Sequence, residues 1–350
     1  MPAHVTTDVK AKQLRDNLAA GSGKLDDYLE LANLLFETNR FGEAVEILRH
    51  ALDVPFGSVE RAVLLTALGG CINVVTLGRD EPRVLGEQAV ALTEGIETCE
   101  ALATRAKAQA LVASCGWLDD PARAEEIAAS ALALFDRVLE ADRLPASVDR
   151  YELLFESARM NCLLRRFEEG ASRCAEALRA ASDQYQKFNS LVELGTIYRE
   201  AGMLTEAREA LARAVRVPDV TALALVRPYN ELALTEEALG KKAEARAKVR
   251  KAIDILQSDP TLPRGYLPDL FREDGYISYE LDDIEEAAKS FKAAVDSYSA
   301  ADPRHWNSLM WLARCDYDLG QLEAARTSAT LVKQSPVASE EDRASADWLL

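Results

Sequence analysis

Histidine, aromatic residues and positive charge are all scarce in this chain. It has three histidines in 350 residues, aromatic residues make up 7%, and 41 Lys and Arg stand against 58 Asp and Glu, for a formal net charge of −17. A strongly acidic surface is repelled by phosphate groups, so the composition disfavours a nucleic-acid partner. A basic or neutral partner fits this charge better.

The short motifs of common catalytic and cofactor sites are also missing. The sequence contains no HExxH, no GxSxG and no glycine-rich dinucleotide turn. The stretch GSGK at 21–24 lacks the first glycine of a phosphate loop, and Leu25 stands where that loop has Ser or Thr. We therefore expect no enzyme activity, no cofactor and no metal site.

Cysteine spacing and hydrophobic runs bear on the cell compartment. The six cysteines include no CxxC pair and lie mostly in apolar helical stretches, which favours reduced thiols in the core. The opening residues MPAHVTTDVKAKQ lack the apolar segment of a signal peptide. The uncharged stretch at 62–78 carries polar residues and a glycine pair, which predicts a buried helix and no membrane span. These features predict a cytoplasmic protein.

One segment shows how the chain is organised. In LVELGTIYREAGMLTEAREALARAV, residues 191–215, apolar residues recur every three or four positions on both sides of Gly202, which predicts two helices. Glycine accepts the left-handed conformation that ends a helix. Gly195 and Ala207 are small enough for the two helices to approach closely. The segment is predicted to be a helical hairpin.

The same twelve-residue distance between two small residues recurs in six places. The pairs are Ala32 and Ala44, Ala158 and Gly170, Gly195 and Ala207, Ala233 and Ala245, Gly275 and Ala287, and Ala313 and Ala325. The corresponding turn residues are Asn39, Arg165, Gly202, Gly240, Asp282 and Gly320. All but Arg165 are types that tolerate a left-handed backbone. Residues four and seven positions after each second small residue are expected in the core, and Cys162 and Cys174 are expected to be buried free thiols.

This pattern resembles a known repeat. The pattern LxxLGxxYxxxGxLxxAxxxLxxA at 191–214 resembles the tetratricopeptide repeat, and Pro218 stands where that family has its proline. The resemblance implies an all-α, right-handed superhelical solenoid of antiparallel helix hairpins, whose first helices line a concave groove. Ala44 and Gly170 are 126 residues apart (170 − 44), about three repeat steps, so two divergent hairpins are expected between them.

The repeat spacing gives a predicted division of the chain. We expect an N-terminal helix and loop at 1–24, a solenoid at 25–337 and a C-terminal capping helix at 338–350. The solenoid is predicted to contain about eight hairpins, at approximately 25–55, 58–95, 98–141, 146–181, 185–216, 222–257, 265–300 and 304–334.

Glutamate recurs on the predicted first helices, two residues before the small residue. The positions are Glu30, Glu156, Glu193, Glu231 and Glu273, with Trp311 in the sixth repeat. One interpretation is an ordinary solvated helix face, since glutamate is a good helix former. The other is an acidic track that attracts Lys or Arg side chains of a partner.

Further groove positions lie one and four residues after the small residue. They bring Tyr, Trp and Arg together toward the C-terminal end, the composition of interface anchors. Tyr279 and Tyr317 are also compatible with the family's core tyrosine shifted by one residue. The predicted partner-binding residues are Glu156, Arg159, Glu193, Arg199, Glu231, Glu273, Tyr276, Tyr279, Trp311, Arg314 and Tyr317.

These features predict a non-catalytic scaffold that binds a protein or peptide segment, with a basic one favoured, in the groove of the solenoid. The alternative is a sensory domain of a signalling or transcription-control system, in which a ligand or peptide shifts a conformational population. A change in the radius of gyration on binding would favour the sensor, and an unchanged radius the scaffold.

Overall fold

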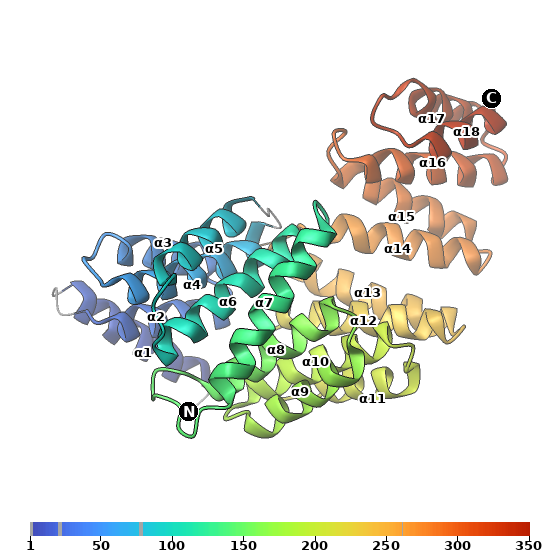
Figure 1. Ribbon diagram of the computed structural model, residues 1–350. Coiled ribbons are helices and arrows are strands. Elements are labelled where there is room, and N and C mark those ends of the chain that lie inside the picture. The colour runs from blue at the N-terminus through green and yellow to red at the C-terminus, as the bar shows by residue number, and fades with distance from the viewer. Residues whose placement is uncertain (1–2, 20–22, 77–79, 261) are drawn as a thin grey trace. The chain divides into compact units, whose positions relative to one another are not determined.

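The computed structural model describes residues 3–19, 23–76, 80–260 and 262–350, and the regular structure in these ranges is entirely helical. The chain divides into two compact units, Met1–Thr221 and Ala222–Leu350. In both units consecutive helices pack against each other in pairs (Figure 1). The predicted all-α fold of helix hairpins is confirmed.

The first unit holds one leading helix and five hairpins within its described residues. The leading helix is α1 (Ala3–Ala19). The hairpins are α2 (Leu25–Glu37) with α3 (Phe41–Ala51), α4 (Ser58–Thr76) with α5 (Asp80–Thr93), α6 (Cys99–Gly116) with α7 (Pro121–Leu139), α8 (Arg150–Leu163) with α9 (Phe167–Ala180), and α10 (Gln184–Glu200) with α11 (Leu204–Ala214).

The second unit holds three hairpins in its described part, preceded by a short 3-10 helix, η1 (Leu223–Leu225), and closed by α18 (Glu340–Leu349). The hairpins are α12 (Val226–Ala238) with α13 (Lys242–Ser258), α14 (Leu267–Glu280) with α15 (Ile284–Ser297), and α16 (Pro303–Asp318) with α17 (Leu322–Gln334). Helix α18 packs against α16 and α17. That the repeats of both units form a single array over 25–337 stays a prediction.

All six predicted turn residues adopt the left-handed conformation. Their φ angles are 61° at Asn39, 59° at Arg165, 77° at Gly202, 75° at Gly240, 61° at Asp282 and 76° at Gly320. Arg165, which sequence reasoning set apart, therefore makes the same turn as the others. A left-handed residue with a side chain costs about 1–2 kcal/mol, so packing of the two helices outweighs local preference there.

The twelve predicted small residues are all buried. The core positions of the second helices are equally enclosed. Zero exposure is found for Leu48, Cys174, Leu211, Val249, Phe291, Ala329, Ala51, Ala177, Ala214, Ala252, Ala294 and Val332. The contact between the two helices of a hairpin is therefore built on one shared register.

The cysteines follow the core prediction in part. All six lie outside disulfides; Cys115, Cys174 and Cys315 are buried, whereas Cys71 and Cys99 are half-buried. Cys162 is only half-buried, because it lies one residue before α8 ends at Leu163. Burial raises the pKa of the Cys315 thiol to about 12, which makes it a poor nucleophile at neutral pH.

The uncharged stretch at 62–78 belongs to α4 as far as Thr76, and residues 77 and 78 lie outside the described residues. Ala62, Leu64 and Leu68 of this helix are buried in the first unit. Among the helices described here, none has the length and apolar character needed to cross a membrane.

The close contact within the hairpins gives a first prediction. A Cβ added at Gly195 would overlap Cγ of Leu211 and lie 2.8 Å from its Cδ2, whereas one at Gly70 would meet no atom within 4 Å. Gly195→Leu should lower the free energy of unfolding by about 1–3 kcal/mol through overpacking. Gly70→Ala, the control in α4, should leave it unchanged or raise it by up to about 1 kcal/mol. Urea unfolding of both variants measures this, and equal stabilities would contradict the helix contact.

Candidate partner-binding grooves

In the first unit, the first helices of four consecutive hairpins border a groove of about 1050 Å³. These helices are α2, α4, α6 and α8. Asn33, Phe36 and Glu156, which the repeat register predicted on the groove side, are among the lining residues. The volume lies at or above the upper end of the range of about 300–1,000 Å³ that is typical of small-molecule sites. The groove is therefore large enough for a segment of another protein.

Apolar side chains that are only partly buried form much of the groove lining. They come from three of the four helices and from the loop before α4. The main ones are Leu29, Phe36, Phe56, Val59, Val63 and Phe155. Small residues lie among them and leave room above the helix backbones, namely Ala32, Ala67, Gly70 and Ala103. Partly exposed apolar groups in a concave site favour contact with apolar side chains of a ligand.

Carboxylates outnumber amines around the same groove. The acidic lining residues are Asp26, Glu60, Glu100, Asp149, Glu152 and Glu156, and the basic ones are Lys24 and Lys107. Nζ of Lys107 donates to Oε2 of Glu152 at 2.6 Å. The remaining charge of the lining is negative.

Three predicted site residues of the first unit, Arg159, Glu193 and Arg199, are not among the lining residues. Nη1 of Arg159 donates to both carboxylate oxygens of Glu156 at 3.1 and 3.0 Å, and Glu156 and then Glu193 raise the pKa of Arg159. Glu193 is 4% exposed and therefore does not belong to a solvated acidic track. Nη2 of Arg199 donates to Oε1 of Glu200 at 2.6 Å. Both of these ion pairs lie within one helix, α8 or α10, and the charge of Glu193 in α10 acts on Arg159 in α8.

A second cavity, of about 390 Å³, lies in the second unit among α14, α16 and α18. Three predicted residues line it, Tyr279, Trp311 and Arg314. The other lining residues are Asn307, Met310, Ser339, Glu341, Asp342, Ser345 and Trp348. Trp348 is 61% exposed and presents a large apolar surface at this site.

The predicted aromatic anchors are in contact with one another. The ring of Trp311 meets those of Tyr276 and Tyr279 edge to face, each at 5.2 Å between centroids. Tyr317 meets Trp348 edge to face at 5.3 Å, and the guanidinium of Arg314 lies 4.7 Å from the centroid of the Trp348 ring. The rings therefore form two groups, one around Trp311 and one around Trp348, and both tryptophans line the same cavity.

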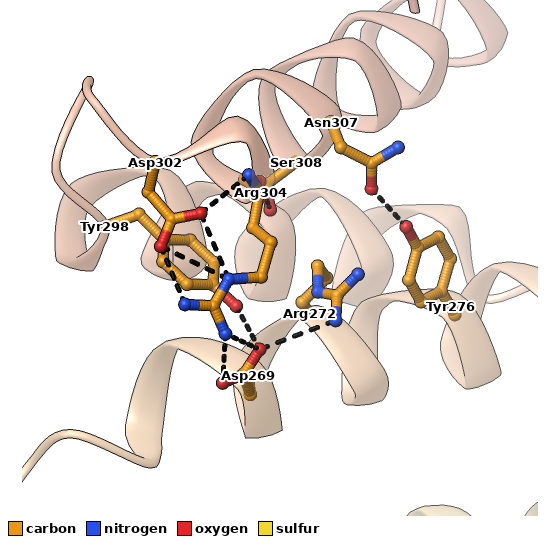
Figure 2. A network of polar contacts seen from close by, with 8 residues as sticks. All are labelled: Asp269, Arg272, Tyr276, Tyr298, Asp302, Arg304, Asn307 and Ser308. Atoms are coloured by element: carbon orange, nitrogen blue, oxygen red, sulfur yellow. Dashed lines mark hydrogen bonds and ion pairs between the residues drawn. The ribbon is translucent and has the colours of Figure 1, made fainter. Parts of the chain in front are cut away.

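Polar contacts hold α14, α16 and the loop before α16 together beside these rings. Figure 2 shows Arg304 donating to both oxygens of Asp269, at 3.1 and 2.9 Å, and also to Asp302. The hydroxyl of Tyr276 donates to Oδ1 of Asn307. The amide of Asn307 donates in turn to Oδ1 of Asp342 in α18 at 2.9 Å. The cavity walls are thus fixed to one another by side chains from three helices.

The two remaining predicted residues, Glu231 and Glu273, do not line that cavity and are half-buried. Burial, together with the negative charge of Glu237, raises the pKa of Glu273 to about 7. A carboxyl group with this pKa is only partly charged near neutral pH. Glu273 is therefore a weaker source of negative potential than the sequence suggested.

Sequence reasoning missed two sets of lining residues. The α4 and α6 contributions, such as Val63 and Glu100, lie in the two divergent hairpins, where no repeat register was assigned. Trp348 lies in the predicted capping helix, which was not considered as part of the groove. The signal that could have identified this part of the site is the tryptophan itself, because an exposed tryptophan on an amphipathic helix is typical of an interface.

Two models of one known repeat family match parts of the chain. A family model described as tetratricopeptide repeat matches residues 192–261 and 275–338, and a second one with the same description matches 28–55. The chain contains tetratricopeptide repeats. The matched ranges contain the small-residue pairs of five of the six hairpins that carry the register, and the α8–α9 hairpin lies outside them.

Several solved structures are similar to this chain. The apo form of RapI covers 88% of this chain and 86% of its own, at a TM-score of 0.58 and 9% identity. Yeast Tom70 covers 97% and 84%, at 0.50 and 12% identity. YrrB, described as a TPR protein with an unusual peptide-binding site, covers 61% and 96%, at 0.44 and 14% identity. A search among curated proteins by sequence gives no match. At these identities the likeness concerns the fold.

The raised pKa of Glu273 predicts a pH-dependent stability. Because its folded-state pKa of about 7 lies above the ordinary value of 4.5, its contribution to stability is full below 4.5 and is lost as the pH rises through 7. Glu273→Gln should therefore be more stable than the wild type at pH 8, on the order of 1 kcal/mol, with little difference near pH 4.5. Urea unfolding at both pH values measures this. The same gain in Glu285→Gln, an exposed position on α15, would refute the assignment to Glu273.

Proposed function

We propose that this repeat protein is a non-catalytic scaffold that holds a segment of a partner protein in grooves lined by the first helices of its hairpins. The observation that carries the proposal is the groove of about 1050 Å³ in the first unit. Its half-exposed apolar residues, among them Val59, Val63 and Phe155, are a surface that association would remove from water. Repeat arrays of this kind use such surfaces for binding.

The second unit supports the same proposal with a different composition. Its smaller cavity combines Trp311, Trp348, Tyr279 and Arg314, and Trp, Tyr and Arg are the residue types that dominate interface energetics. Carboxylates of Glu341 and Asp342 lie at the same cavity. Aromatic faces beside carboxylates favour a partner that inserts a cationic or aromatic side chain.

The groove proposal predicts position-specific crosslinking. A benzophenone amino acid should capture a partner from native extracts when it replaces Val63 in the groove of α4. The same group at Val84, a 42% exposed valine on the second helix α5, should capture none. Adducts are detected as shifted bands and identified by mass spectrometry. Adducts from Val84 alone would place the binding surface on the outer helices and contradict the proposal.

Trp348 is predicted to be an anchor of the second unit. With a partner captured as above, Trp348→Ala should speed its dissociation, at a loss of about 2 kcal/mol or more in binding free energy for a true anchor. Leu331→Ala, a 50% exposed side chain on α17, is the control that should leave dissociation unchanged. Both variants must keep their helical content and melting temperature. Surface plasmon resonance measures the rates, and equal effects would refute a special role for Trp348.

The same partner separates the scaffold from a sensor. Small-angle scattering with and without the bound segment should give the same radius of gyration for a scaffold. A clear decrease would indicate a ligand-driven closure and favour the regulatory function.

A further inference from the structure

We propose that the groove of the first unit receives a lysine- or arginine-rich amphipathic segment, with apolar side chains on the groove floor and basic side chains against its carboxylates. This inference rests on the proposed function and specifies the chemistry of the partner. It applies to the groove bordered by α2, α4, α6 and α8, most of which lies outside the residues that sequence analysis selected.

The first argument is charge. Six carboxylates and two amines line the groove, and one of the amines, Lys107, is already bound to Glu152. Asp26, Glu60 and Glu100 have no basic partner among the described residues. Within the described ranges, the carboxylate of Glu60 accepts only the backbone N–H of Gly57, at 2.8 Å, and that of Glu100 only the hydroxyl of Ser147, at 3.5 Å. Like charges around one concavity repel, and a basic ligand relieves that repulsion.

The second argument is the position of the apolar residues. Val59 and Glu60 are neighbours at the start of α4, and Leu29 lies one turn from Asp26 on α2. Apolar and acidic side chains therefore alternate over short distances along the groove. A ligand that satisfies both must itself carry apolar and basic side chains close together, as an amphipathic segment does.

The alternatives fit less well. An acidic segment would add its charge to that of the groove and lose the electrostatic gain. A purely basic segment would leave Val59, Val63 and Phe155 in contact with water. Nucleic acid is repelled by the same carboxylates that attract a basic peptide.

Designed peptides test this directly. Four fluorescein-labelled peptides of about 18 residues, or five helical turns, are titrated with the full chain. Fluorescence anisotropy measures how tightly each peptide binds. The first has leucine at helical spacing with lysine between, and the second has glutamate in place of lysine. The third keeps the lysines but has serine for leucine, and the fourth is a scrambled form of the first. The first should bind at least about tenfold tighter than each of the others, with an affinity that falls between about 50 and 300 mM salt.

Matched variants locate the binding. Asp26→Asn, Glu60→Gln and Glu100→Gln together should weaken the first peptide at least about fivefold at low salt and flatten its salt dependence. Glu125→Gln, Glu168→Gln and Glu169→Gln, three exposed carboxylates on the second helices α7 and α9, remove the same charge and should have little effect. Val59→Ala with Val63→Ala should weaken binding while leaving its salt dependence in place. Circular dichroism and melting confirm that each variant is folded.

The outcomes separate the two proposals. If the glutamate peptide binds as well as the lysine peptide, or the two carboxylate triples behave alike, the basic-segment inference is wrong, while capture of a partner at Val63 would still support the groove. If no peptide binds and Val63 captures nothing, both proposals fail. Binding of the scrambled peptide equal to the first would show that charge alone attracts it and would also overturn the inference.

Discussion

Each hairpin in this protein depends on the close approach of two helices at a pair of small residues. Gly195 shows the constraint most directly, because any Cβ there would overlap Leu211 of the facing helix. At Gly275 an added Cβ would lie 2.8 Å from the ring of Phe291. In both hairpins a large core side chain of the second helix, Leu211 or Phe291, therefore packs directly against the backbone of the first helix. This contact buries one face of each first helix against the second helix. The opposite face of the first helix then points away from the second helix.

The two units use that opposite face differently. In the first unit, α2, α4, α6 and α8 leave it open as a groove with half-exposed apolar residues. In the second unit, side chains of α18 cover part of the corresponding face. Asn307 connects Tyr276 to Asp342 of α18, and Arg314 lies over Trp348 of the same helix. A smaller cavity remains there, which suits an inserted side chain better than a long segment.

The sequence predicted the hairpins in which the helix contact at small residues repeats at one spacing. It gave no register for the hairpins in which that contact lies at other positions. The twelve-residue spacing led to the pair of Gly195 and Ala207 and to the left-handed turns. It could do so because only small residues fit where two helix backbones approach closely. In the second hairpin the glycines lie mainly against the next hairpin: Gly69 of α4 is nearest to Leu111 of α6 and also lies near Pro82 of α5, and Gly86 of α5 is nearest to Val112 and Ala108 of α6. These small residues therefore serve mainly a contact between hairpins, so the spacing of twelve within one hairpin does not apply here. This hairpin and the next lie outside the ranges that the two family models match, 28–55, 192–261 and 275–338.

Side-chain environment was the harder part to predict. Glu193 occupies a groove position in the repeat register but is buried beside the Arg159 and Glu156 pair, since the register fixes direction and not the depth of neighbouring side chains. Glu273 occupies the equivalent position in α14, yet burial leaves it only partly charged near neutral pH. A glutamate ladder read from spacing alone therefore includes carboxylates that are paired with a basic side chain, such as Glu30 and Glu156, or only partly charged, such as Glu273.

The carboxylates that hold the fold together can be told apart from those in the groove by their partners. Asp274, with a buried side chain, accepts from Arg250 at 2.9 Å and from Ser290, and Arg250 also binds Glu286. Such charges are compensated where they are buried, as their desolvation requires. Asp26, Glu60 and Glu100 face the groove without a basic partner among the described residues, so the fold gains no ion pair from them. Their mutual repulsion is a small cost to the folded unit, and it is the free energy that a basic partner would recover on binding.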